Sequence, residues 1–472
     1  MLLISLKSSV TSRKLQRAVV IVGGTKGARL MRRIRILQIG DIHYPDWRLH
    51  QSNLDAKDSQ FAPGITDGLR RSSFPAILRK IGQLATGPSC HGVVFVGDFT
   101  TAGRSEYLDG VFRHFTLLCR RKNKKFGTPL LFVPGNHDVN RADARDLGRL
   151  EKFRAMSQLA AKYHWEKVPS EQPIQVKLTG KDCTLILTLL NTAVGSWELH
   201  NLPEFLRDKL QAADKHTAAV DLGSFSGAEI DPAHAPGVPA KLVEQYYGQL
   251  DTPYVMPQML DAVQRTLDEV NATFGVLVGH HNLLPQKIPR ISPYGEMLNA
   301  GFVRSQMLSL NRPLVYLHGH IHQDPVEVVS DPRLPDSKLI LISAPEIKDG
   351  FNEIVFYISE HDDLVGIRLI PHRARSEDGT LVEAAHCFIS TLSPSRASID
   401  SRTFDLFRRL KQHKEERSGD LLFWNEVQDL AGSNFEGEAL EDALIMLHAS
   451  HWIEIDDLNK PNKSWRIQLK GK

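Results

Sequence analysis

Residues 34–43 read IRILQIGDIH, and residues 129–138 read PLLFVPGNHD. In both stretches a short apolar run ends in a glycine, and polar side chains that can bind metals follow directly. An apolar run of this length, bounded by glycine, is typical of a buried strand. Because side chains just past strand ends can converge at one edge of a sheet, the two stretches predict a functional site between strand ends.

Three further segments repeat this pattern. VVFVGD ends at Asp98, VLVGHH ends at His281, and LVYLHGHIH ends at His322. Together the five segments supply carboxylates, imidazoles and one amide, with no thiolate, and this donor set suits manganese, iron or zinc. Two such cations held roughly 3.5–4 Å apart can clamp the attacking and leaving oxygens of a phosphoester. The sequence therefore predicts a two-metal phosphoesterase.

Each motif alone is weak, since the chain holds 20 histidines and Gly-Asp is a common turn. A purely structural interpretation treats all five segments as turns that end strands. Their occurrence together, and in this order, favours the catalytic interpretation. In that interpretation Asp98 suits a bridging carboxylate. His137 could protonate the leaving oxygen, and Asp138 could hold the ring of His137 in one tautomer.

The combined motifs resemble the calcineurin-like metallophosphoesterase superfamily over about residues 34–370. The resemblance implies an α/β protein, a four-layer αββα sandwich with a dinuclear centre of two divalent or trivalent ions between loops. By position, His137 would take the acid or phosphate-orienting role, while His281 would face the substrate or only pack. His318 would be structural. One metal would be held by Asp41, His43, Asp98 and His322, and the other by Asp98, Asn136, His280 and His320, with Asp98 bridging.

Within the superfamily, three elements resemble the bacterial cyclic-nucleotide phosphodiesterase branch. They are the pair of histidines followed by NLLP at residues 282–285, GHIHQ at 319–323, and LNT at 190–192. The resemblance implies a metal-dependent phosphoric ester hydrolase that prefers phosphodiesters to monoesters and uses water activated by two metals. Its substrate would be a phosphoester, with a nucleotide as one candidate.

Length and composition bound the domain organisation. At 472 residues the chain is long enough for two or three domains. The predicted parts are a basic, disordered tail or mis-assigned start (1–33), the metallophosphoesterase domain (34–392) with an insertion over the active site (about 196–255), a linker (393–400) and a small winged-helix-like α+β domain (401–472).

Apolar periodicity places the elements along the chain. Strands that alternate with helices predict α/β layering. The predicted helices are 69–85, 106–122 and 256–271, with 401–413, 422–431 and 437–449 in the last domain. Besides the five strands before the motifs, predicted strands are 174–177, 184–190, 338–342, 354–358 and 365–370, with 452–455 and 464–469 in the last domain.

Charge and cysteine usage exclude some classes. The net charge is only +3, so composition alone does not indicate nucleic-acid binding. The longest apolar runs are strand-sized, which predicts no membrane partner. Isolated cysteines fit a reducing compartment, so we expect a cytoplasmic protein. The sequence does not predict an oligomeric state. The cysteines are Cys90, Cys119, Cys183 and Cys387.

Two alternatives remain open from the sequence. A nuclease is one, because winged helices often bind duplexes. Against it, Glu438, Glu441 and Asp442 on the expected recognition helix would repel phosphates, so docking to a protein is an equal interpretation of the last domain. The other alternative is a non-enzymatic, metal-bearing scaffold whose tail binds protein.

Overall fold

The computed structural model describes residues 31–45, 63–120, 128–140, 144, 150–180, 183–197, 252–285, 297–322, 325–375, 379–392, 399–417, 419, 421–435, 438–458, 460 and 462–470. Most of the predicted tail, insertion and linker lies outside these residues. The first strand begins at Met31, so residues 31–33 belong to the first sheet rather than to the tail predicted for 1–33. Backbone pairing decides this boundary, since Met31 lies opposite Ser359 in the neighbouring strand.

The first sheet contains seven strands, β1 (Met31–Ile39), β2 (Gly92–Phe95), β3 (Leu130–Phe132), β10 (Gly350–Ser359), β11 (Leu364–Ala374), β12 (Leu381–Glu383) and β13 (Cys387–Ser390). Their order is β12-β11-β10-β1-β2-β3, and β13 also pairs with β11. β1, β2 and β3 are parallel, and their register aligns Ile39 with Phe95 and Phe95 with Phe132. The three strands therefore end together, and the loops that follow them start at one sheet edge.

The second sheet contains six strands, β4 (Ile174–Thr179), β5 (Thr184–Leu189), β6 (Gly275–Val278), β7 (Pro313–His318), β8 (Val326–Ser330) and β9 (Lys338–Ser343). Their order is β4-β5-β6-β7-β9-β8, and β5, β6, β7 and β9 are parallel. The register aligns Leu189, Val278 and Leu317. The carboxyl ends of β6 and β7 are thus level with each other.

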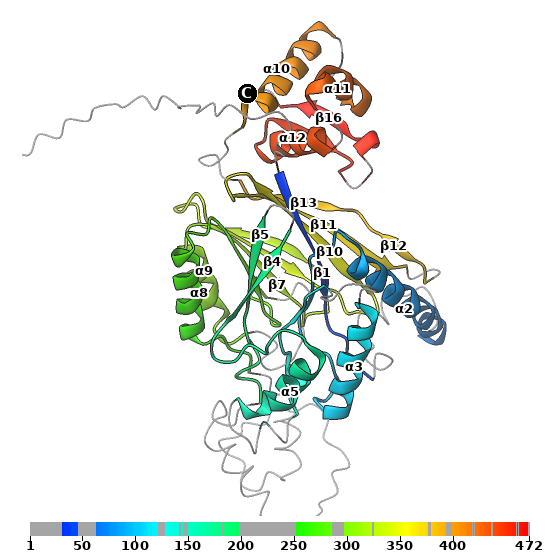
Figure 1. Ribbon diagram of the computed structural model, residues 1–472, viewed down its shortest axis with the longest axis vertical. Coiled ribbons are helices and arrows are strands. Elements are labelled where there is room, and N and C mark those ends of the chain that lie inside the picture. The colour runs from blue at the N-terminus through cyan, green and yellow to red at the C-terminus, as the bar shows by residue number, and fades with distance from the viewer. Residues whose placement is uncertain are drawn as a thin grey trace, which may run out of the picture.

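The two sheets face each other across one apolar core, and helices cover both outer faces (Figure 1). Successive side chains of a strand pack on opposite faces of the sheet. Val94 points between the two sheets, while Phe95 points toward the helices. On the outer face, Phe112 and Trp165 pack with ring centroids 4.4 Å apart. The helices are α2 (Pro63–Thr86), α3 (Ser105–Leu118) and α5 (Arg154–Tyr163) on the first sheet, and α8 (Pro257–Glu269) and α9 (Ala300–Ser309) on the second.

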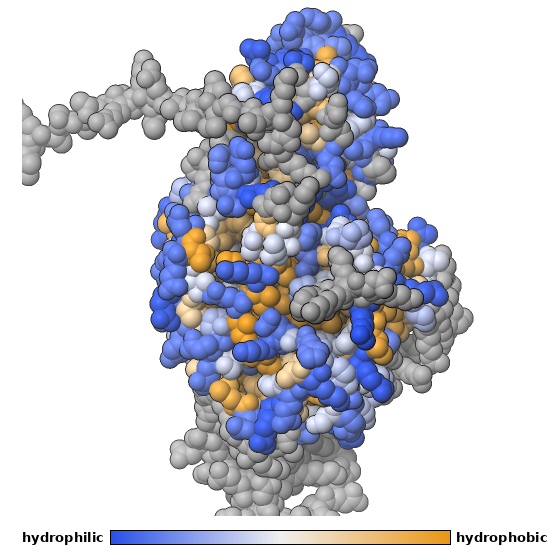
Figure 2. Space-filling view, viewed as in Figure 1, coloured by the Kyte–Doolittle hydropathy of each residue, from blue (hydrophilic) through white to orange (hydrophobic). Residues whose placement is uncertain are grey.

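The C-terminal part is a smaller unit of helices and an antiparallel sheet of order β14-β16-β15. Its first helix is capped by Asp400, whose carboxylate accepts from the amides of Arg402 and Thr403. Figure 2 shows a mainly hydrophilic surface over its outer helices. The elements are α10 (Ser401–Glu416), β14 (Leu421–Phe423), α11 (Trp424–Ala431), α12 (Glu438–Ala449), β15 (Ile453–Asp456) and β16 (Arg466–Leu469).

This unit is joined to the two-sheet domain through a continuous core. Met31 and Tyr357 of the first sheet lie in the same apolar cluster as Leu444 of α12. At the edge of this contact, Arg33 forms an ion pair with Asp442. The acidic face of α12 therefore faces the first sheet.

Most predicted elements are confirmed, with boundary shifts of a few residues. Short elements escaped prediction, among them α9, β8, β12, β13 and β14. The prediction of a helix at 422–431 was wrong at its start, because β14 ends at Phe423 before α11 begins. Among the described residues, no helix is both long and apolar enough to span a bilayer.

Candidate metal centre

The predicted site residues gather where strands of the two sheets end. Asp41 follows β1, Asp98 follows β2 and Asn136 follows β3, while His280 follows β6 and His320 follows β7. All are fully or largely buried except His320, which is partly so. The packing of the sheets face to face thus brings side chains from opposite layers into one place.

Several of these residues have a left-handed backbone. The φ angles are 44° for Asp41, 50° for His43, 52° for Asp98, 70° for His320 and 52° for His322. This backbone conformation is unfavourable for residues other than glycine. Residues that are held in it are often found at functional sites. Asp41 and His43 are two residues apart on such a turn, and both side chains lie in the same group of candidate ligands.

One group comprises Asp41, His43, Asp98 and His322, whose candidate ligand atoms all lie within 4.8 Å of one another. His43 Nε2 lies 3.1 Å from His322 Nε2 and 4.0 Å from Asp98 Oδ2. His322 Nε2 lies 4.0 Å from Asp41 Oδ1. Two imidazole nitrogens bound about 2.1 Å from one ion would be separated by about 3.0–3.4 Å, so the first spacing fits a shared ion.

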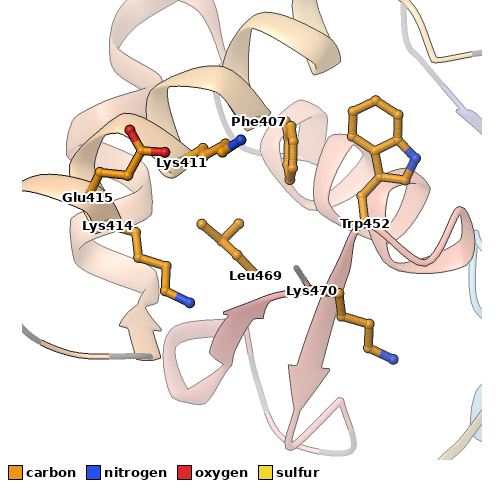
Figure 3. Close-up of a pocket in the computed structure, with 7 residues that line it drawn as sticks. All are labelled: Phe407, Lys411, Lys414, Glu415, Trp452, Leu469 and Lys470. Carbon is orange, nitrogen blue, oxygen red and sulfur yellow. The ribbon is translucent and has the colours of Figure 1, made fainter. Parts of the chain in front are cut away.

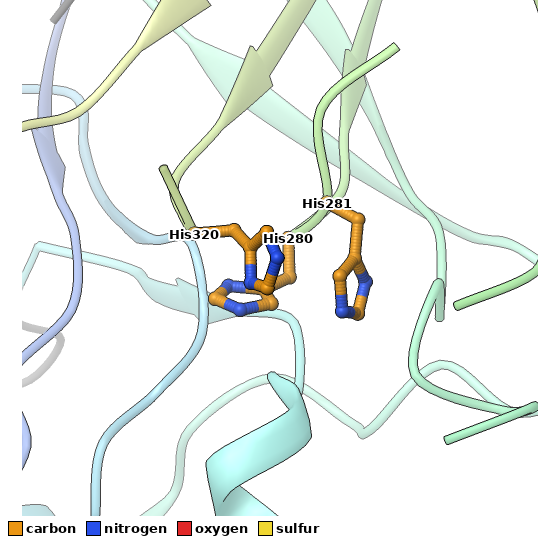
Figure 4. Close-up of side chains that lie close together, drawn as sticks. All are labelled: His280, His281 and His320. Carbon is orange, nitrogen blue, oxygen red and sulfur yellow. The ribbon is translucent and has the colours of Figure 1, made fainter. Parts of the chain in front are cut away.

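The second group comprises His280, His281 and His320 (Figure 4). Their ring centroids lie 4.6–5.1 Å apart. His280 Nε2 lies 3.1 Å from Asn136 Oδ1 and 3.3 Å from Asp98 Oδ2. Asp98 therefore connects this group to the first one.

Hydrogen bonds tie the loops to these carboxylates. The His137 amide donates to Asp98 Oδ1 at 2.9 Å, and the His320 amide donates to Asp41 Oδ1 at 3.1 Å. A Cβ at Gly135 would overlap the Asp98 side chain and backbone, so glycine is needed for this close approach. The carboxylates are thereby oriented before any ion binds.

His280 is oriented from behind. Its Nδ1 lies 2.7 Å from the carbonyl of Val96, which accepts the Nδ1 hydrogen. Nε2 is then left to face Asp98 and Asn136. A backbone carbonyl that fixes the tautomer of a metal-binding histidine in this way is a common arrangement.

The charge balance also fits metal ions. Among the described residues, no lysine or arginine forms an ion pair with Asp41 or Asp98, although both are buried. Burial and the charge of Asp98 raise the pKa of Asp41 well above its usual range. Burial favours neutral His280, but Asp98 and Asp41 raise its pKa to about 10. Without an ion, protons on Asp41 and His280 therefore offset the negative charge of the buried carboxylates, and a bound cation would take over this role.

His137 and Asp138 lie on the turn after β3. The carbonyl of Thr101 lies 3.1 Å from His137 Nδ1, which leaves Nε2 as the nitrogen that can act on a substrate. The Asp138 carboxylate accepts from the amides of Thr100 and Gly135. The predicted contact between Asp138 and the His137 ring is therefore replaced by one from Thr101, because the tight turn directs Asp138 back into its own loop.

Thr192 belongs to LNT at 190–192, and the sequence does not predict it as a site residue. Its hydroxyl accepts from the amides of His280 and His281 at 3.2 Å each, and lies 2.8 Å from His281 Nδ1. Tyr316 donates its hydroxyl hydrogen to the His281 carbonyl. His281 is fully buried, so a substrate contact by this residue stays a prediction.

Two further residues define the surroundings of the site. Trp197 donates its indole N–H to the carbonyl of Asn136, which anchors the start of the predicted insertion to the turn after β3. His318 lies outside both groups, as predicted; its Nδ1 lies 3.1 Å from the Gly319 carbonyl, and burial lowers its pKa to about 4. A structural role for His318 stays a prediction.

The family profile for calcineurin-like phosphoesterases matches residues 34–324. The chain belongs to this family. It is a metal-dependent phosphoester hydrolase, and the scaffold alternative is set aside. No curated protein is similar enough to count as a match.

Three solved structures with related architecture share little sequence identity with this chain. A dimetal phosphatase from Danio rerio is 14% identical with a TM-score of 0.41, over 77% of this chain and 100% of that chain. The NAD nucleotidase of Haemophilus influenzae is 12% identical with a TM-score of 0.37, over 75% and 60%. The phosphopantetheinyl hydrolase of Mycobacterium tuberculosis is 14% identical with a TM-score of 0.32, over 66% and 90%. Similarities this low carry no argument about substrate.

Proposed function

We propose that the first group, together with Asn136 and with His280 and His320 of the second group, forms a dinuclear metal centre for phosphoester hydrolysis. The observation that carries this proposal is the position of Asp98, whose Oδ2 lies 4.0 Å from His43 Nε2 and 3.3 Å from His280 Nε2. When bound, manganese, iron or zinc ions would supply an activated water and neutralise charge on the phosphoester oxygens. One ion would be held by Asp41, His43, Asp98 and His322, and the other by Asp98, Asn136, His280 and His320.

In this proposal, His137 delivers a proton to the leaving oxygen. Its ring centroid lies 5.1 Å from that of His43, and its side chain is only partly buried. With Nδ1 against the carbonyl of Thr101, the proton to be transferred sits on Nε2. Asp138 acts on this step indirectly, by fixing the loop that carries His137.

We propose a phosphodiester, with a nucleotide as the candidate class, as the preferred substrate. The support is local, since the elements that resemble the cyclic-nucleotide branch converge on the site. Thr192 of the LNT element hydrogen-bonds the backbone of His280 and His281, which form the other element. This arrangement ties both elements to the second group of side chains.

The nuclease alternative depends on the C-terminal unit, for which we propose a winged-helix arrangement. In a duplex-binding winged helix, the recognition helix must enter the major groove. Eight of the twelve residues of α12 are buried, and Asp442 on this helix pairs with Arg33 of β1. We therefore infer that α12 joins the domains instead of reading DNA.

A different surface of this unit is available to an anionic partner (Figure 3). A cavity of about 470 Å³ lies between α10 and the sheet, with Phe407, Trp452 and Leu469 as apolar walls and Lys411, Lys414 and Lys470 as its cations. Glu415 also lines this cavity and reduces its positive charge. We place any contact with nucleic acid or protein at this surface.

A hydrolysis panel with manganese tests the proposed function. It compares bis(p-nitrophenyl) phosphate, p-nitrophenyl phosphate, cyclic nucleotides, and single- and double-stranded DNA. We expect turnover of the diester and its loss in Asp98→Asn. The control is Asp109→Asn, which removes a surface partner of Lys162 and should retain activity. Undiminished turnover in Asp98→Asn would eliminate the proposed centre.

Salt dependence separates the nuclease from the small-substrate hydrolase. We expect the full chain to show no DNA affinity that depends steeply on salt, because α12 is covered. Tight binding that is lost in Lys411→Glu would instead favour the nuclease and locate DNA at the basic cavity.

A further inference from the structure

The loop between β9 and β10 runs beside the first group of side chains. Glu346 of this loop forms a parallel bridge with Gly40, the residue before Asp41. The amide of Ile347 lies 3.4 Å from the carbonyl of Asp41. This loop was not predicted to take part in the site, yet its backbone is fixed against the start of the metal-ligand turn.

The Glu346 side chain faces the back of His322. Its Oε2 lies 3.8 Å from His322 Nδ1. The other ring nitrogen, Nε2, lies 3.1 Å from His43 Nε2 and 4.0 Å from Asp41 Oδ1. The two ring nitrogens therefore have different neighbours: Nε2 faces the ligand group and Nδ1 faces Glu346.

Lys348 balances the charge of Glu346. Its Nζ lies 2.8 Å from Glu346 Oε2, and the two residues are 6% and 2% exposed. Burying a carboxylate next to Asp41 would be costly without a partner, because like charges repel strongly where water is excluded. The attraction of Lys348 offsets part of that cost, and the 2.8 Å contact holds the carboxylate in place.

We propose that Glu346 and Lys348 form a positioning pair for His322. The Glu346 carboxylate would accept the Nδ1 hydrogen and hold Nε2 toward the ion, and Lys348 would fix the carboxylate. The 3.8 Å separation is longer than a hydrogen bond, so the pair is expected to close when an ion polarises the ring. This inference rests on the proposed metal centre. It assigns no contact with substrate to either residue.

The sequence around the pair agrees with this role. Glu346 and Lys348 are two residues apart in SAPEIKDGF at residues 343–351, where β9 has ended and β10 has not begun. As at Asp41 and His43, a turn at the end of a strand lets side chains at this spacing meet. The ion pair therefore joins residues that are close in sequence, whereas the carboxylate of Glu346 approaches His322, which follows a different strand, β7.

The test measures metal binding directly. Glu346→Gln keeps the shape and removes the charge, while Lys348→Met keeps the stem and removes the ammonium. Each purified protein is loaded with manganese, metal equivalents are counted by elemental analysis, and affinity is measured by competition with a chelator. Replacing such supporting groups typically weakens metal affinity about 10–100-fold, and we expect this loss for one of two ions in each variant.

Controls separate positioning from general destabilisation. Asp109→Asn and Lys162→Met break an ion pair of 2.6 Å between the surfaces of α3 and α5, which includes none of the proposed ligands, and should leave both affinities unchanged. Should Lys348→Met fail to fold, the double variant Glu346→Gln/Lys348→Met removes both charges together and should bind like Glu346→Gln alone. Excess manganese should restore kcat in Glu346→Gln.

The outcomes distinguish this inference from the proposed centre. The pair is supported if the wild-type protein binds two equivalents of manganese and Glu346→Gln binds one of the two ions more weakly. Equal affinities in wild type and a folded Glu346→Gln would overturn the pair while leaving the centre in place. A wild-type protein that takes up no metal would overturn both.

Discussion

Replacing Thr192 by valine tests how the second group of side chains is positioned. Valine has the shape of threonine but no acceptor. The Thr192 hydroxyl is fully buried and lies 3.2 Å from the amide nitrogens of His280 and His281. Leaving a buried donor without a partner costs about 1–3 kcal/mol, so two donors with long hydrogen bonds should cost about 2–4 kcal/mol of unfolding free energy. Because the same contact orients the His280 ligand, metal affinity should also fall, by about 10–100-fold.

Thr192→Ser is the matched control because it keeps the hydroxyl and removes only a methyl group. It should cost about 0.5–1.5 kcal/mol, as the loss of one buried methyl usually does. Urea unfolding of the metal-free proteins gives the first quantity, and chelator competition with manganese gives the second. The reasoning is refuted if Thr192→Val unfolds at the same urea concentration as Thr192→Ser, or if both bind manganese as wild type does.

Three other perturbations follow from the structure. Gly135→Ala should reduce metal content and turnover by at least tenfold, because its Cβ would overlap Asp98; wild-type loading measured by elemental analysis would contradict this. Metal loading near pH 7 should release protons, since the pKa of His280 is raised to about 10 without an ion and the ligand must be neutral. Affinity should therefore rise with pH, and calorimetry in buffers of different ionisation enthalpy should detect the release. Asp442→Ala should destabilise domain docking by about 1–2 kcal/mol by leaving Arg33, which is 25% exposed, with a weaker partner. Unchanged resistance to limited proteolysis between the domains would argue against that contact.

The strands of the catalytic domain could be predicted from the sequence because two separate signals identify each of the five strands before the motifs. An apolar run identifies each strand, and a glycine with polar residues marks its end, as at Gly97 and Asp98. Three of these runs lie side by side in the first sheet and two in the second, so their ends meet once the sheets pack together. The proximity of Asp41, His43, Asp98 and His322 follows from this arrangement.

The supporting residues could not be predicted in the same way. Glu346, the ion-pair partner of Lys348, reaches His322 only after β9 and β10 are placed in different sheets, and no local pattern encodes that contact. Thr192 was marked only by its resemblance to a family element, which gave no role for its hydroxyl. Asp138 was expected beside the His137 ring because the two are neighbours in sequence, but the turn directs its carboxylate to backbone amides.

The C-terminal unit shows how domain contacts escape sequence analysis. The acidic residues of α12 suggest a helix that is unfavourable for binding DNA, and in the structure one of them, Asp442, contacts the first sheet. Asp442 pairs with Arg33, which the sequence assigned to a disordered tail. Neither residue suggests the other, because 409 positions separate them along the chain.

Anomalous X-ray diffraction from crystals of the manganese-loaded protein, recorded at the manganese edge, tests the central claim most directly. The account predicts two peaks about 3.5–4 Å apart, with Asp98 between them and His322 and His280 on opposite sides. A single peak, or manganese bound away from the ends of β2 and β6, would contradict it.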